Sequence, residues 1–201
     1  MTFPASCPSV RGMGARAWVD ESIHLDVEAG GIYVLAAAII HEDRDLDDIR
    51  RQLRRLVPRR QVRLHWHTEG EGARMRVIDT IAELRLEHVV VIRAGVDPKR
   101  QERARRKGLE RLVFELSQRA VAQMIVESRG PKLDGHDRDL MAAQRGFQAA
   151  GSDINVSFAR PLEEPMLWIP DAVAGAIALA RSGRESRYYN TLIDTLYVCA
   201  I

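Results

Sequence analysis

Apolar residues recur along the chain with two periods, which predict strands and helices in alternation. A nearly continuous apolar run at residues 32–40 begins and ends with β-branched residues, as is typical of a strand covered by helices on both faces. Shorter apolar or alternating segments predict the other strands. The predicted strands lie at about residues 16–22, 32–40, 62–67, 87–96, 120–127 and 154–159, with a turn at 26–31.

Amphipathic helical segments separate most of these strands. Apolar residues recur at helical spacing after Asp45, which favours the N-cap position, and Pro58 ends that helix. On its outer face Asp47 and Arg51 are spaced to form an ion pair. Asp-Pro at 97–98 marks the start of another helix. The predicted helices occupy about residues 45–57, 71–86, 97–119, 139–149, 171–180 and 188–201, and loops cover 130–138 and 161–170.

Strands that alternate with helices predict an α/β fold. The chain has 201 residues, a length that suits one domain with a sizeable core. Prolines and glycines near the start predict a flexible segment at 1–14, which leaves a single domain at 15–201. No internal repeat, low-complexity tract or linker divides that domain.

The two cysteines, Cys7 and Cys199, lie near opposite ends and form no metal or redox motif. The N-terminus lacks the features of a signal peptide, and the apolar run at 32–40 is too short to span a bilayer. We therefore expect a cytoplasmic protein without a membrane partner.

Basic residues are concentrated in two helical segments, although the net charge of the chain is only +2. One segment has seven arginines within residues 50–63, and the other lies at 100–111. Such faces can neutralise the phosphates of DNA or RNA. They can equally be solvated faces balanced by acids such as Asp47 and Asp48. Aromatic residues are not interleaved with the arginines, so a stacking platform for single strands is not indicated.

Acidic residues stand at unusual positions in the predicted elements. Asp20 and Glu21 end one strand, Glu127 ends another, and Asp171 lies in the first turn of a helix that is otherwise almost entirely apolar. Strand ends and helix starts meet at one edge of an α/β sheet. Carboxylates gathered there repel one another, and a divalent cation relieves that repulsion. Two cations ~4 Å apart activate water and stabilise the leaving oxygen in phosphodiester cleavage.

Each of these acids also has a simpler interpretation. The segment 20–22 can form a turn in which Asp and Ser bond their own backbone. Glu127 can pair with Arg129 just beyond the strand. Asp171 can serve only to stabilise the positive end of its helix.

A second constellation contains His65, His67 and Glu69. If the strand at 62–67 extends that far, its period of two places all three on one face. Such a pair of histidines with a carboxylate can hold zinc, manganese or iron. The alternative is two half-exposed histidines at the end of a strand.

Several of these segments together resemble a bacterial family called domain of unknown function 3800, which is considered ribonuclease H-like. The resemblance covers residues 15–181 as short, separate motifs. They are Asp-Glu-Ser at 20–22, the apolar strand at 33–40, Glu-Ser-Arg at 127–129 followed by Asp137, and Pro-Met-Leu-Trp-Ile-Pro-Asp-Ala-Val-Ala-Gly-Ala at 165–176.

The resemblance implies a ribonuclease H-like mixed sheet flanked by helices, with acidic residues that bind two Mg²⁺ or Mn²⁺ ions. The catalytic residues carried over by position are Asp20, Glu127 and Asp171, with Glu21 and Asp137 as further metal ligands. The sequence departs from the ribonuclease H pattern in lacking a clear acidic residue on a helix after the third strand, where Glu69 or Glu71 are the candidates. It also has Glu at position 127, where many related nucleases use Asp.

The sequence thus predicts a metal-dependent nuclease or phosphodiesterase that acts on DNA or RNA. One alternative is a non-catalytic binding module on the same fold. Another is a mononuclear metal hydrolase built on the histidine constellation. The oligomeric state is left open.

Overall fold

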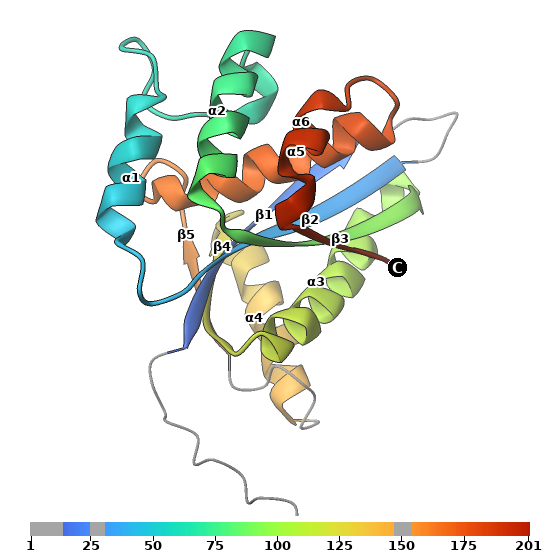
Figure 1. Cartoon of the computed structure of the whole chain (residues 1–201). Coiled ribbons are helices and arrows are strands. Elements are labelled where there is room, and N and C mark those ends of the chain that lie inside the picture. The colour runs from blue at the N-terminus through green and yellow to red at the C-terminus, as the bar shows by residue number, and fades with distance from the viewer. Residues whose placement is uncertain (1–13, 25–30, 147–153) are drawn as a thin grey trace, which may run out of the picture.

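The computed structural model describes residues 14–24, 31–146 and 154–201, and it places them in one six-stranded sheet with helices on both faces (Figure 1). The strand order is β5-β4-β1-β2-β3-β6. The strands are β1 Ala15–His24, β2 Gly31–Ile40, β3 Glu87–Val96, β4 Val121–Glu127, β5 Asn155–Ala159 and β6 Leu196–Ala200. The helices are α1 Leu46–Arg55, α2 Glu71–Leu84, α3 Gln101–Gln118, α4 Pro131–Gly146, α5 Trp168–Arg181 and α6 Arg187–Leu192.

The sheet is mixed. The first three strands form an antiparallel meander, whereas β4 runs parallel to β1, β5 runs parallel to β4, and β6 runs parallel to β3. This arrangement confirms the predicted mixed sheet flanked by helices. The predicted flexible segment 1–14 and the turn at 26–31 fall almost wholly outside the described residues.

Two apolar cores lie on opposite faces of the sheet. One contains side chains of α1, α2 and α5, and the other contains side chains of α3 (Figure 1). Helix α5 lies on β1 and β2 and is buried on every side through its first three turns, except at Asp171, which is partly exposed. A helix that is apolar all round belongs in an interior. Its position on the sheet brings that one carboxylate to the end of β4.

Three predicted elements were wrong. Residues 62–67 form no strand, and a 3₁₀ turn, Trp66–Thr68, lies there instead. Leu64 and Trp66 bury their side chains in the core that also contains side chains of α1, α2 and α5, called the α5 core below. Residues 131–138 belong to α4, because Pro131 occupies its first position, where proline suits a helix. Residues 188–201 form α6, a 3₁₀ turn and strand β6, since pairing with β3 outweighs local helical spacing.

The predicted ion pair between Asp47 and Arg51 was also wrong. Asp47 pairs with Arg50 at 3.0 Å, and Arg51 pairs with Asp48 at 3.1 Å. The N-cap role of Asp45 was confirmed, because its carboxylate accepts hydrogen bonds from two backbone amides of the first turn of α1. Among the described residues, no helix combines the length and the apolar character needed to cross a bilayer.

One buried polar side chain stands out in the core. His88 of β3 lies beside Ala38 and Leu196 in the sheet and is 0% exposed. Neither ring nitrogen has a hydrogen-bond partner among the described residues. Burial lowers the pKa of His88 from 6.5 to about 4. The native state therefore holds a neutral imidazole at a cost in stability.

We expect His88→Leu to make the protein more resistant to acid. Because the folded-state pKa is depressed, the stability associated with neutral His88 is complete above pH 6.5 and is lost as pH falls toward about 4. At about 1.4 kcal/mol per pKa unit, the loss amounts to roughly 3 kcal/mol. Urea unfolding at several pH values should show this loss in wild type and not in His88→Leu. The exposed His41→Leu is the control, and an equal acid response in wild type and His88→Leu would contradict the assignment.

A candidate acidic active site

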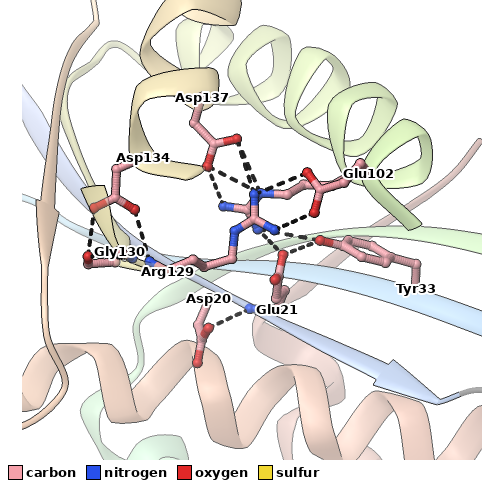
Figure 2. A network of polar contacts seen from close by, with 10 residues as sticks. Asp20, Glu21, Tyr33, Glu102, Arg129, Gly130, Asp134 and Asp137 are labelled. Carbon is pink, nitrogen blue, oxygen red and sulfur yellow. Dashed lines mark hydrogen bonds and ion pairs between the residues drawn. The ribbon is translucent and has the colours of Figure 1, made fainter. Parts of the chain in front are cut away.

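The parallel pairing of β1 and β4 sets two carboxylates side by side. Val19 lies opposite Val126 in the register, so the next residues, Asp20 and Glu127, are neighbours at the end of β4. Side chains alternate along a strand. Asp20 therefore faces α5, on the same side as Trp18, whereas Glu21 faces the opposite side of the sheet (Figure 2).

Helix α5 adds a third carboxylate, that of Asp171. All three acids line one pocket of about 220 Å³, which we call the carboxylate pocket. Glu21 also borders it. The polar residues that line the carboxylate pocket are Asp20, Glu21, Arg63, His65, His67, Arg105, Glu127, Arg129 and Asp171.

Asp20 lies at the centre of the electrostatics of this pocket. It is 8% exposed, and the backbone N–H of Glu21 donates a 2.7 Å hydrogen bond to its Oδ1. Burial raises the pKa of Asp20 well above its usual range, and the charges of Glu127 and then Asp171 raise it further, while Arg105 acts in the opposite direction. Asp20 therefore interacts with both other carboxylates, and its ionisation beside them is unfavourable without a cation.

The donor set of the pocket suits a hard divalent cation. Carboxylate oxygens are the ligands that Mg²⁺ and Mn²⁺ prefer. Within the described ranges, no three His, Cys, Asp or Glu side chains are already gathered closely enough to form a metal site. The repulsion that raises the pKa of Asp20 is nevertheless the penalty that a cation among these carboxylates would remove.

Asp171 is oriented by the segment that was predicted to be a strand. The backbone N–H of Trp66 donates a 3.0 Å hydrogen bond to Asp171 Oδ2, and His65 Nδ1 lies 3.5 Å from the same oxygen. The 3₁₀ turn Trp66–Thr68 thus fixes the carboxylate at the start of α5.

Gly175 of α5 is what allows this turn to approach the helix. A Cβ atom at position 175 would overlap the indole of Trp66 and lie only 2.6 Å from Cγ. The same indole packs edge-on against Tyr188, with ring centroids 5.1 Å apart. Gly175 therefore permits close packing against Trp66.

We expect Gly175→Leu to destabilise the protein by ~1–3 kcal/mol, because the larger side chain overpacks the contact with Trp66. Gly175→Ala should also destabilise, although alanine is the better helix former. The control is Gly135→Ala in α4, where a Cβ meets nothing within 4 Å. Chemical denaturation measures all three, and unchanged stability in Gly175→Leu would contradict the contact.

Glu21 and Asp137 belong to a separate network centred on Arg105 of α3, whose side chain is 3% exposed. Arg105 donates to Asp137 at 2.7 Å and to Glu21, and the hydroxyl of Tyr33 also donates to Glu21. Figure 2 shows the side chain of Glu21 directed toward Tyr33 and away from Asp20. Asp137 does not line the carboxylate pocket; it borders a neighbouring pocket of about 440 Å³. Arg105 joins its carboxylate to that of Glu21, but Asp137 shares no pocket with Asp20, Glu127 and Asp171.

Arg129, just beyond β4, joins this network rather than pairing with Glu127. It binds Glu102 at 2.7 Å and lies 3.6 Å from Asp137 (Figure 2). The simple pairing of Glu127 with Arg129 is therefore not what the structure shows. The contributions of Arg105 and Arg129 to the pocket could not be found from sequence, because their partners lie far away along the chain.

The histidine constellation does not have the strand geometry expected of it. His65 and His67 line the carboxylate pocket with ring centroids 5.9 Å apart, and Glu69 is buried outside its lining. His24 of β1 lies 5.5 Å from His67, centroid to centroid, and burial lowers its pKa. Among the described residues these groups form no metal site as they stand.

Comparisons with known proteins agree with this architecture. Bst-RNase HIII in complex with Mn²⁺ superimposes with a TM-score of 0.52 at 15% identity, over 89% of this chain and 56% of that chain. A point mutant of Bst-RNase HIII superimposes with a TM-score of 0.51, at the same identity and coverage. RNase HII from Archaeoglobus fulgidus, solved with PCNA, has a TM-score of 0.47 at 18% identity, over 89% of this chain and 77% of that chain. No family model and no curated protein matches the sequence.

The chain therefore has a ribonuclease H-like α/β fold, as predicted. It spans 56% of the length of the Bst-RNase HIII chains. At this identity the likeness defines the fold, and the chemistry has to be argued from the pocket.

Proposed function

We propose that this protein is a metal-dependent phosphodiesterase that hydrolyses nucleic acid. Asp20, Glu127 and Asp171 would hold two divalent cations, Mg²⁺ or Mn²⁺. The observation that carries the proposal is that Asp20, Glu127 and Asp171 line one pocket, where Glu127 and Asp171 help to raise the pKa of Asp20. The same fold in an RNase HIII solved with Mn²⁺ supports the choice of cation.

The bound cations would supply water activation and stabilisation of the leaving oxygen. The protein's own residues prepare the site for them. The amide of Glu21 fixes one oxygen of Asp20, and the amide of Trp66 fixes one oxygen of Asp171. Preorganised ligands of this kind keep a site rigid before the substrate arrives. Glu21 and Asp137 are left out of the proposed ligand set, because Arg105 occupies both.

Basic side chains around the pocket would position the substrate. Arg63 and His65 border it from the segment after α1, and Arg105 and Arg129 border it from the other side. Phosphate contacts fix the register of a nucleic acid without reading its sequence. No protein nucleophile is needed in this scheme.

The first test is cleavage of labelled single- and double-stranded DNA and RNA with Mn²⁺, with Mg²⁺ and with chelator. We expect cleavage only with a divalent cation. Mn²⁺ should also raise the melting temperature, because a ligand that binds the native state stabilises it by mass action, ~2.7 kcal/mol at a concentration 100 times its Kd. Binding of nucleic acid without cleavage or metal stabilisation would instead favour a non-catalytic binding module.

A further inference from the structure

Residues 49–68 contain seven arginines, two histidines and no acidic residue. The segment covers most of α1 and the chain that leads from it to the 3₁₀ turn at Trp66–Thr68. The acidic residues of α1, Asp47 and Asp48, lie just before this segment. The question is which of the seven arginines are neutralised by residues elsewhere in the fold.

Two of the arginines have acidic partners. Arg50 binds Glu164 at 2.7 Å and Asp47 at 3.0 Å, and Arg51 binds Asp48 at 3.1 Å. The other five form no ion pair with any residue that the structure describes. These five are Arg54, Arg55, Arg59 and Arg60, all exposed, and Arg63, which lines the carboxylate pocket.

Most basic residues of α3 behave differently. Arg106 and Lys107 both pair with Glu110, at 3.3 Å and 2.7 Å, and Arg111 pairs with Glu115 at 2.7 Å. Helix α3 also packs on the other face of the sheet from α1 (Figure 1). Arg103 of α3 is also exposed and has no ion pair with any described residue. The α1 side differs in that five unpaired arginines lie within ten consecutive residues, 54–63.

A structural role accounts for only part of this charge. Arg54 and Arg55 lie in the last turn of α1, where cations stabilise the helix dipole. Arg59 and Arg60 follow Pro58, beyond the helix, so the dipole does not explain them. From there the chain leads to Arg63, His65 and the carboxylate pocket.

We propose that Arg54, Arg55, Arg59 and Arg60 form a strip that binds the phosphate backbone of duplex nucleic acid outside the carboxylate pocket, with Arg63 where the strip meets it. A duplex fits better than a single strand, because Trp66, the only Phe, Tyr or Trp of the segment, is buried and cannot stack on a base. Arginine suits this role because its planar guanidinium binds phosphate oxygens in pairs. The strip rests on the proposed function, because it delivers a substrate to that pocket.

The test is the salt dependence of duplex binding, measured in chelator so that no cleavage occurs. Each phosphate contact contributes ~0.9 to the slope of log K against log salt for a duplex. The double variant Arg59→Gln/Arg60→Gln should therefore reduce the slope by about 2, uniformly across sequences. The matched control, Arg106→Gln/Lys107→Gln on α3, removes the same charge from paired residues and should leave the slope unchanged.

Three results would overturn the strip. The first is an equal slope change in both double variants, and the second is tighter binding to a single strand than to a duplex of the same length. The third is that the strip variant loses binding to anionic vesicles while its binding to duplex stays equal to that of wild type. Cleavage by wild type is scored separately. If wild type cleaves nucleic acid but the strip variant binds duplex as wild type does, only the strip proposal is overturned. If the strip variant binds duplex more weakly but wild type does not cleave, only the proposed hydrolase activity is overturned.

Discussion

Asp20→Asn is expected to abolish Mn²⁺-dependent cleavage while leaving the fold intact. The substitution keeps the shape of the side chain and removes the charge that would hold the cation. Asn Oδ1 can still accept the hydrogen bond that the amide of Glu21 donates to Asp20. Binding of duplex in chelator should persist, because the arginine strip is untouched.

The same variant should be more stable than wild type when no metal is present. Burial and the neighbouring carboxylates raise the pKa of Asp20 above its usual 3.8, so ionised Asp20 opposes folding. The loss of folding stability is absent below pH 3.8, the unfolded-state pKa, and it develops as pH rises through the higher pKa of Asp20 in the folded state. The stability gain of Asp20→Asn should therefore be present at neutral pH and disappear in acid, whereas added Mn²⁺ should stabilise only wild type.

Asp79→Asn is the matched control, since Asp79 is exposed on α2 and takes no part in the pocket. It should cleave like wild type and respond to Mn²⁺ in the same way. Equal cleavage by wild type and Asp20→Asn would show that the activity comes from another site or a contaminant. That result would end the assignment of Asp20 as a metal ligand.

The sequence predicted the structure correctly where the local hydrophobic pattern agrees with the burial in the fold. The run of small and apolar residues at 171–180 predicted a buried helix, and α5 confirms it with Asp171 in its first turn. The sequence predicted that Asp20 ends its strand, which was wrong, because β1 continues to His24 and pairs with β2 along that length. The register of β1 and β4 nevertheless makes Asp20 a neighbour of Glu127, which does end its strand. The roles of these residues, and the resemblance to domain of unknown function 3800, stay predictions.

Sequence reasoning failed where distant partners decide the structure. Leu64 and Trp66 alternate with polar residues as in a strand, but they bury their side chains in the α5 core without a strand partner. Strand β6 exists because β3 offers it an edge. The partner of Asp137 is Arg105, 32 residues earlier, and sequence spacing gave no sign of it. The role of Asp137 as a metal ligand stays a prediction. No local pattern encodes an ion pair between two helices.

Arg105→Ala is expected to be the most destabilising of the substitutions considered, by ~3–5 kcal/mol. It removes the cation from a network in which Asp137 and Glu21 are both largely buried. A carboxylate left in an interior without its partner costs far more than the pair itself contributes. The charge of Arg105 also lowers the pKa of Asp20, so its loss should weaken metal binding at neutral pH as well.

The neighbouring Arg106→Ala is the control, because Arg106 is exposed and, among the described residues, forms an ion pair only with Glu110, at 3.3 Å. A surface pair of this kind contributes ~0–1 kcal/mol. A double-mutant cycle of Arg105→Ala with Asp137→Ala, measured by urea unfolding, separates the network from simple loss of packing. Coupled residues give non-additive effects, so the double variant should lose less stability than the sum of the two single variants. Additive losses, or equal losses for Arg105→Ala and Arg106→Ala, would show that Arg105 does not hold these carboxylates in the folded protein.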